Sequence, residues 1–250
     1  MGVFRIINSG SSGNSYILDC LGEYLLIELG VKWDNILNGL NYKTGDVVGC
    51  LVSHRHSDHS KSISKALYRR LSVYSCVDVS ERFNGVFPLK PNKKYKIGKF
   101  EIQCIPVPHG DCPCYSFIID NPDMGRMLFI TDASDFPYKV KGVNHLFIEA
   151  NYMEDIILDN ACNNKWNSSA SNTHMGIEKS AEVIKRHYSE NLHTVCLIHL
   201  SDGNSDANKF KDIVFEEVGI RPFIAESGLE IELKKKNFKE KKECINLEII

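Results

Sequence analysis

The chain is 250 residues long, which is enough for one large domain or two small ones. Its composition, 43% hydrophobic and 25% charged, is typical of an ordinary globular protein. The formal net charge of −2 excludes a global positive field that would hold nucleic acid, although a local basic surface remains compatible with it.

Nine cysteines are scattered along the chain, and none forms a CxxC pair. No apolar run approaches 18 residues, and the residues after Met1 lack the pattern of a signal peptide. We therefore expect a cytoplasmic protein with reduced thiols and no membrane contact. Cys112 and Cys114, the closest pair, are expected to be small packed strand residues, with redox sensitivity near a site as the alternative.

Apolar runs and turn signals predict strands and helices in mixed order. Strands are expected at residues 4–8, 16–19, 23–28, 49–52, 71–76, 99–107, 115–120, 126–131, 143–150, 194–198, 222–225 and 229–233. Helices are expected at residues 33–40, 60–71, 175–187 and 206–218, with a short helical or irregular stretch at 79–84. This order suits two facing sheets with helices on the outside.

Residues 1–233 are expected to form one domain, and residues 234–250 a basic C-terminal tail. The basic residues lie in the segment 234–242, and Ile245, Leu247 and Ile249 then alternate as they would in a strand. The tail is either a solvated extension or an added edge strand or partner contact.

The segment 53–59 carries four metal-capable side chains, His54, His56, Asp58 and His59, within six positions. Histidine is the commonest metal ligand, and aspartate is its usual hard companion. In an extended segment, His54 and His56 point the same way and can grip one ion. A helix starting near Asp58 would aim Asp58 and His59 toward a second ion, so we interpret the segment as the seed of a two-metal site.

Three further candidates follow buried strands: His109, Asp132 and His199. Each is the first polar, metal-capable residue after its apolar run. Alone, such a histidine is more often structural, and Asp132 could be a turn or helix-capping residue. Beside the histidine-rich segment, the three together favour a shared metal site.

This set of residues closely resembles the metallo-β-lactamase superfamily, whose pattern is HxHxDH followed by a distant His, Asp and His. The resemblance implies an α/β fold, a four-layer αββα sandwich with the site at one edge. By the same resemblance, one ion is held by His54, His56 and His109, the other by Asp58, His59 and His199, and Asp132 bridges them. The implied cofactors are two divalent ions, zinc by default, with manganese or iron also accepted by N and O ligands.

Four stretches are similar to the YycJ/WalJ-type branch of bacterial and phage proteins, which is linked to nucleic-acid processing. They are residues 10–15, 149–152, 173–175 and 199–202. Glu28 stands where many relatives carry Asp and is expected to orient a ligand histidine. The stretch 110–114 also departs from the family pattern.

Two cations about 3.5–4 Å apart would generate a metal-bridging hydroxide and neutralise charge on the substrate. Asp58 is then a candidate to orient this nucleophile. His174, before a helix, is a candidate proton donor or substrate contact, with a capping or core-edge role as the alternative. Asn151 and Ser201 are candidates for substrate contact or ligand support, whereas His145, His187 and His193 are expected to be structural.

The favoured function is a phosphodiesterase or nuclease acting on DNA or RNA. Lys61, Lys65, Arg69 and Arg70 would supply local positive charge for phosphates, unless they are only the wet face of a helix. The alternatives are a small-molecule hydrolase (cyclic nucleotide phosphodiesterase, lactonase or thioesterase) and a binding protein without turnover. Beyond the nucleic acid or phosphodiester substrate, a homodimer is a further possible assembly.

Overall fold

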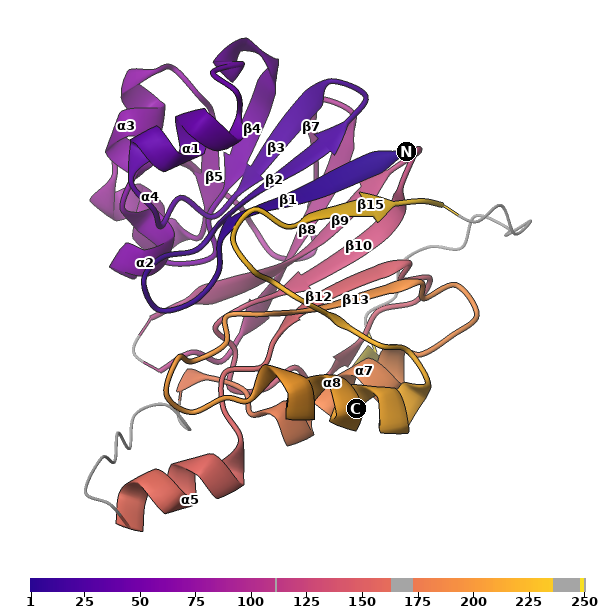
Figure 1. Cartoon of the computed structure of the whole chain (residues 1–250). Coiled ribbons are helices and arrows are strands. Elements are labelled where there is room, and N and C mark those ends of the chain that lie inside the picture. The colour runs from indigo at the N-terminus through magenta and orange to yellow at the C-terminus, as the bar shows by residue number, and fades with distance from the viewer. Residues whose placement is uncertain (111, 163–172, 236–247, 250) are drawn as a thin grey trace.

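The computed structural model describes residues 1–110, 112–162, 173–235 and 248–249. In these residues two seven-stranded sheets face each other, and helices cover their outer sides (Figure 1). The predicted four-layer αββα sandwich is therefore confirmed. None of the described helices is both long enough and apolar enough to cross a membrane.

The first sheet contains the strands that come first and last in the sequence of the sandwich. Its members are β1 (Gly2–Asn8), β2 (Ser15–Cys20), β3 (Glu23–Ile27), β4 (Val47–Leu51), β5 (Val73–Ser75), β6 (Phe87–Pro88) and β15 (Glu230–Leu233). Their order is β15–β1–β2–β3–β4–β5–β6. Because β3, β4 and β5 pair in parallel, the segments that leave β3 and β4 emerge at the same edge.

The second sheet directs several strand ends toward one edge in the same way. Its members are β7 (Lys94–Ile97), β8 (Phe100–Val107), β9 (Cys114–Asn121), β10 (Gly125–Ile130), β12 (His145–Glu149), β13 (Thr194–Ile198) and β14 (Phe223–Ile224). Their order is β14–β13–β12–β10–β9–β8–β7. Strands β10, β12 and β13 are mutually parallel, and β8 runs in the same direction because β9 is antiparallel to both β8 and β10.

Helices cover both sheets from outside (Figure 1). The described helices are α1 (Trp33–Gly39), the 3₁₀ helix η1 (Thr44–Asp46), α2 (Ser57–Ser60), α3 (Ile63–Tyr68), α4 (Val77–Arg82), α5 (Glu154–Cys162), which projects away from the sheets, α7 (Ile177–His187) and α8 (Ala207–Val218). Helices α1, α3 and α4 contact the first sheet, and α7 and α8 contact the second. The Asp206 side chain caps α8 by accepting hydrogen bonds from two backbone amides, and Gly219 ends it at a φ of 69°.

Aromatic side chains from both sheets meet in the middle of the sandwich. The ring centroids of Phe4 and Phe147 lie 4.0 Å apart, and those of Tyr16 and Phe129 lie 5.4 Å apart. All four side chains are fully buried. Large buried rings contribute most of the apolar area in such a core and fix the two sheets relative to each other.

Parts of the sequence prediction differ from the structure. The helix expected at residues 60–71 is present as α3 but is shorter at both ends, and Ser60 belongs to the separate helix α2. The break falls at Ser62, which hydrogen-bonds the backbone oxygens of Leu29 and Val31. Helix α5, the 3₁₀ helix η1 and strands β6, β7 and β11 were not predicted, because none of them has the long apolar periodicity on which the prediction depended.

The C-terminal tail is described only in part. Strand β16 (Glu248–Ile249) pairs antiparallel with β11 (Tyr138–Lys139), in a two-stranded sheet apart from the two large ones. The residues Ile245 and Leu247, used to predict a strand, lie outside the described residues, as does most of the basic run. The division at residue 233 stays a prediction.

Gly30, just after β3, lies directly against the loop that carries the histidine-rich segment. Its neighbour Leu29 donates a backbone hydrogen bond to the His59 oxygen at 2.9 Å, and Asn14 donates one to the Asp58 oxygen at 2.7 Å. A Cβ at position 30 would overlap the backbone carbonyl of Asp58. Because the obstacle is backbone, only a shift of this loop could make room.

We predict that Gly30→Ala lowers the free energy of unfolding by at least about 1–3 kcal/mol, the cost of overpacking a tight contact. Urea denaturation followed by circular dichroism measures it. Gly45→Ala is the matched control, because a Cβ at Gly45 meets no atom within 4 Å. Equal stability of the two variants would contradict the close contact at Gly30.

Candidate metal centre

The candidate site lies at the edge where strand ends from both sheets converge. The loop between β4 and α2 supplies His54 and His56, and α2 itself supplies Asp58 and His59. The segments after β8, β10 and β13 supply one side chain each. The structure brings all seven predicted ligands together: His54, His56, Asp58, His59, His109, Asp132 and His199. These side chains form two groups, each with donor atoms within 4.8 Å of one another.

Three residues at the ends of strands in this site have left-handed backbone conformations. The φ angles are 62° for Glu28, 47° for Asp132 and 54° for His199. Such values are uncommon for residues other than glycine, and they cluster where surrounding contacts hold the backbone in a strained conformation. Each turn redirects the chain as it leaves the sheet, so that the side chain enters the site.

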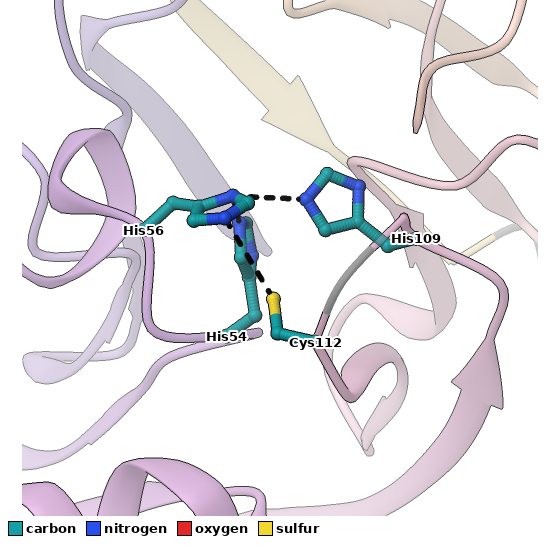
Figure 2. Close-up of side chains that lie close together, drawn as sticks. All are labelled: His54, His56, His109 and Cys112. Carbon is teal, nitrogen blue, oxygen red and sulfur yellow. Dashed lines mark hydrogen bonds between the residues drawn. The ribbon is translucent and has the colours of Figure 1, made fainter. Parts of the chain in front are cut away.

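The first group is built around three histidines (Figure 2). Nδ1 of His56 lies 2.9 Å from Nε2 of His54 and 3.0 Å from Nε2 of His109. Ligand nitrogens around a tetrahedral zinc ion are about 3.3 Å apart for Zn–N distances of about 2.0–2.1 Å. The three rings therefore need only a small outward movement to fit a metal ion.

Cys112 also belongs to this group, and the sequence did not predict its membership. One donor atom from each of His54, His56, His109 and Cys112 lies within 4.8 Å of all the others. The Cys112 side chain is buried, as expected, but it lies in the loop before β9 and not in a strand. Cys114 does lie in β9 and is fully packed, as predicted.

The second group contains Asp58, His59, Asp132 and His199. Nε2 of His59 lies 3.2 Å from Asp58 Oδ2 and 3.2 Å from Asp132 Oδ1. Nε2 of His199 lies 3.5 Å and 3.6 Å from the same two oxygens. Nitrogen and carboxylate donors of this kind suit zinc, manganese or iron.

Asp132 touches both groups through different oxygens. Oδ1 faces His59 and His199, whereas Oδ2 lies 3.8 Å from Nε2 of His54 and 3.9 Å from Nε2 of His109. The side chain is 2% exposed. A carboxylate in this position could contact two ions at once.

Burial shapes the protonation of these groups. Burial lowers the pKa of His54 well below its usual value, which favours the neutral imidazole that binds metals. Burial alone would raise the pKa of Asp132, but the neighbouring His199 and His59 outweigh it and hold this pKa well below the usual range. These surroundings therefore favour the neutral form of His54 and the ionised form of Asp132.

Residues behind the two groups hold the side chains in place. Glu28 Oε2 lies 3.3 Å from Nδ1 of His59, the contact expected of a residue that orients a ligand histidine. The Asn151 amide lies 3.1 Å from Nδ1 of His199 and donates to the His199 backbone oxygen at 2.9 Å. Ser201 contacts His199 only indirectly, because its backbone amide donates a hydrogen bond to the backbone oxygen of Asn151.

His174 stands beside the second group. Its ring stacks on that of His199, with centroids 5.1 Å apart, and Nδ1 lies 3.1 Å from Glu149 Oε2. Burial lowers the pKa of His174, but the hydrogen bond and charge of Glu149 outweigh burial and raise it to about 9. The His174 side chain is 19% exposed, so its ring is the one beside the second group that solvent reaches.

Sequence reasoning missed two supporting residues, Asn14 and Glu149. The fully buried Glu149 accepts backbone hydrogen bonds from Ala133 and Met175, which fixes the segments after Asp132 and His174. Glu149 is the last residue of β12. The rule that identified His109, Asp132 and His199, a metal-capable residue at the end of an apolar run, would therefore have found it. Asn14 Nδ2 lies 3.1 Å from Nε2 of His59, and no spacing in the sequence indicated that contact.

The remaining histidines named in the sequence lie away from these groups. His145 and His187 are buried and hydrogen-bonded to backbone oxygens of Met124 and Val183. Burial lowers the pKa of each to about 4. The ring of His193 lies beside that of His145, with centroids 6.4 Å apart.

Comparisons with known proteins agree with this geometry. A relative described as the exodeoxyribonuclease WalJ of Streptococcus pneumoniae is 25% identical over 225 residues, covering 81% of this chain and 82% of the relative. The metallo-β-lactamase fold protein YhfI from Bacillus subtilis superposes with a TM-score of 0.71 at 16% identity, covering 92% of this chain and 98% of YhfI. The short form of human tRNase Z superposes with a TM-score of 0.64 at 13% identity, covering 92% and 99%.

A family model described as the β-lactamase superfamily domain matches residues 39–200. This range holds all seven predicted ligands, three strands of the first sheet (β4, β5 and β6) and all strands of the second sheet except β14. The chain belongs to the β-lactamase superfamily, as a hydrolase of the metallo-β-lactamase fold.

Proposed function

We propose that this chain is a nuclease-type phosphodiesterase that cleaves DNA or RNA with two divalent metal ions, zinc being the expected ion. The observation that carries the proposal is Asp132, whose two oxygens face two separate donor groups. The similarity to a protein described as an exodeoxyribonuclease and the shared fold of a tRNase support a nucleic-acid substrate. The odd, scattered cysteines favour action in a reducing compartment such as the cytoplasm.

In this proposal the ligands divide as the two groups do. His54, His56 and His109 would hold one ion. Asp58, His59 and His199 would hold the other, and Asp132 would contact both. When bound, such a pair supplies Lewis acidity at the scissile phosphate and an activated water.

The protein's own side chains then orient and transfer protons. The Asp58 side chain is 24% exposed and can accept a hydrogen bond from an attacking water. His174 is held by Glu149 through Nδ1, which leaves Nε2 for a substrate oxygen or a leaving group. Asn151 and Ser201 keep His199 in position.

A basic groove supports a polyanionic substrate. Its volume is about 450 Å³, and it is lined by Lys32, Trp33, Asp34, Leu37, Lys61, Ser62, Lys65, Tyr68 and Arg69. Four of these residues are cationic and one is acidic. Lys61 follows His59 by two positions in the chain, although none of the lining residues is a predicted metal ligand. The Tyr68 ring is 82% exposed, and the buried Nε1 of Trp33 has no hydrogen-bond partner among the described residues.

The proposal is tested by incubating the zinc- or manganese-loaded protein with labelled single-stranded DNA, duplex DNA and RNA. Cleavage that EDTA abolishes is expected. The same assay includes bis-p-nitrophenyl phosphate, a cyclic nucleotide, a lactone and a thioester. Hydrolysis of a small molecule with the nucleic acids intact would instead identify a small-molecule hydrolase, and no turnover by the metal-loaded protein would indicate a binding protein.

We predict that His54→Ala, His56→Ala and Asp132→Ala each remove activity and lower the bound metal, because each loses a ligand at the centre of the site. Elemental analysis of the purified variants measures the metal, and circular dichroism checks the fold. His193→Gln should keep both metal and activity. A full metal complement in the three ligand variants would overturn the assignment.

His174→Ala should lower kcat by about 10²–10⁴, the usual contribution of a positioned proton donor, with bound metal unchanged. Steady-state kinetics and elemental analysis of the same preparation separate the two effects. Loss of metal would make His174 a ligand, because it also belongs to a third donor group with Asp132, Glu149 and His199.

The double variant Lys65→Glu/Arg69→Glu should weaken binding of a single-stranded oligonucleotide at least tenfold at low salt. It should also reduce the slope of log Kd against log salt by about one to two, because each phosphate contact adds somewhat less than one to that slope. Fluorescence anisotropy measures both. The control Lys90→Glu/Lys96→Glu makes the same charge change on another surface, and equal weakening by both variants would show that the groove has no special role.

A further inference from the structure

We propose that Cys112 is a fourth protein ligand of the three-histidine group, so that one metal position binds through three imidazoles and a thiolate. The inference builds on the proposed metal centre and adds a ligand to it. Figure 2 shows the four side chains directed toward one another from two loops.

The local backbone places Cys112 beside the histidines. Its amide donates a hydrogen bond to the His109 backbone oxygen at 3.2 Å, which closes a tight turn directly after His109. The side chain is 7% exposed, and Sγ lies 3.9 Å from Nε2 of His56. Nε2 is not the His56 nitrogen that faces His54 and His109, so this distance alone does not place the sulfur at the ion. The support for a shared ion is that one donor atom from each of the four side chains lies within 4.8 Å of all the others.

Cys114 provides an internal comparison two residues away. Its Sγ lies 3.8 Å from Nδ1 of His54 and donates to the Thr131 backbone oxygen at 3.7 Å. Nδ1 of His54 also meets Ser53 Oγ, whereas Nε2 of the same ring faces His56 and Asp132. Cys114 therefore lies on the opposite side of the His54 ring from the metal group.

A thiolate ligand changes what the site accepts. When the metal binds, the Cys112 S–H proton leaves to solvent and a metal–sulfur bond forms. The thiolate adds one negative charge to three neutral imidazoles, and it is a soft donor that favours zinc or cadmium over manganese. We therefore expect this position to be selective for zinc among the ions that a histidine site alone would admit.

The test uses the full chain loaded with Co²⁺, whose thiolate complexes show an intense sulfur-to-cobalt charge-transfer absorption in the near ultraviolet. The wild type and Cys114→Ser should show this band, and Cys112→Ser should lose it while keeping the visible cobalt bands of the remaining nitrogen and oxygen ligands. A cobalt-loaded wild type without the band, or a band that persists in Cys112→Ser, would overturn the proposal.

A competition titration against a chromophoric chelator gives a second readout. Cys112→Ser should weaken zinc at one position at least tenfold, the size of effect seen even when a residue behind a ligand is lost, and should leave manganese affinity unchanged. Equal zinc affinities of Cys112→Ser and Cys114→Ser would contradict a ligand role. Neither readout depends on turnover, so absence of nuclease activity with the cobalt band intact would reject the proposed function and leave this inference standing.

Discussion

The structure depends on one electrostatic constraint, which is that several carboxyl groups share a site from which most water is excluded. Glu28 and Glu149 are fully buried, Asp132 is 2% exposed and Asp58 is 24% exposed. Removing a carboxylate from water costs several kcal/mol unless opposite charge and hydrogen bonds compensate. Divalent cations would compensate part of the negative charge that this cluster of carboxyl groups can carry. Metal binding and the stability of this edge of the fold are therefore expected to be coupled.

The two sheets bring these groups together by a simple rule. Parallel pairing directs the ends of β3 and β4 to one edge of the first sheet, and the ends of β10, β12 and β13 to one edge of the second. Left-handed backbone at Glu28, Asp132 and His199 then turns the chain as each strand ends. The paired strands thus hold the segments that carry the predicted ligands at one edge of the sandwich.

The sequence predicted the parts of this arrangement that follow from local patterns. The spacing of His54, His56, Asp58 and His59 is short enough to show that they lie close together, and the expected turn into a helix separated the first two from the last two. The position of His109, Asp132 and His199 after apolar runs indicated strand ends. The assignment of these three distant residues to the two ions came from the family resemblance, because no local pattern indicates which distant side chains share an ion.

The remaining features depend on contacts between distant segments. Asn14 meets His59 only because the turn after β1 packs against the loop at Asp58. Cys112 was interpreted as a packed strand residue, since a thiol two positions from another in an apolar run has no distinguishing pattern. The helix expected at residues 60–71 begins only at Ile63, because Ser62 hydrogen-bonds a segment about thirty residues earlier in the chain.

The most direct test of this account is a crystal structure of the zinc-loaded protein with anomalous diffraction measured at the zinc edge. The account predicts two anomalous peaks, one among His54, His56 and His109 and one among Asp58, His59 and His199, with an Asp132 oxygen contacting each. A map with no peak among these side chains, or with the zinc bound elsewhere, would contradict it.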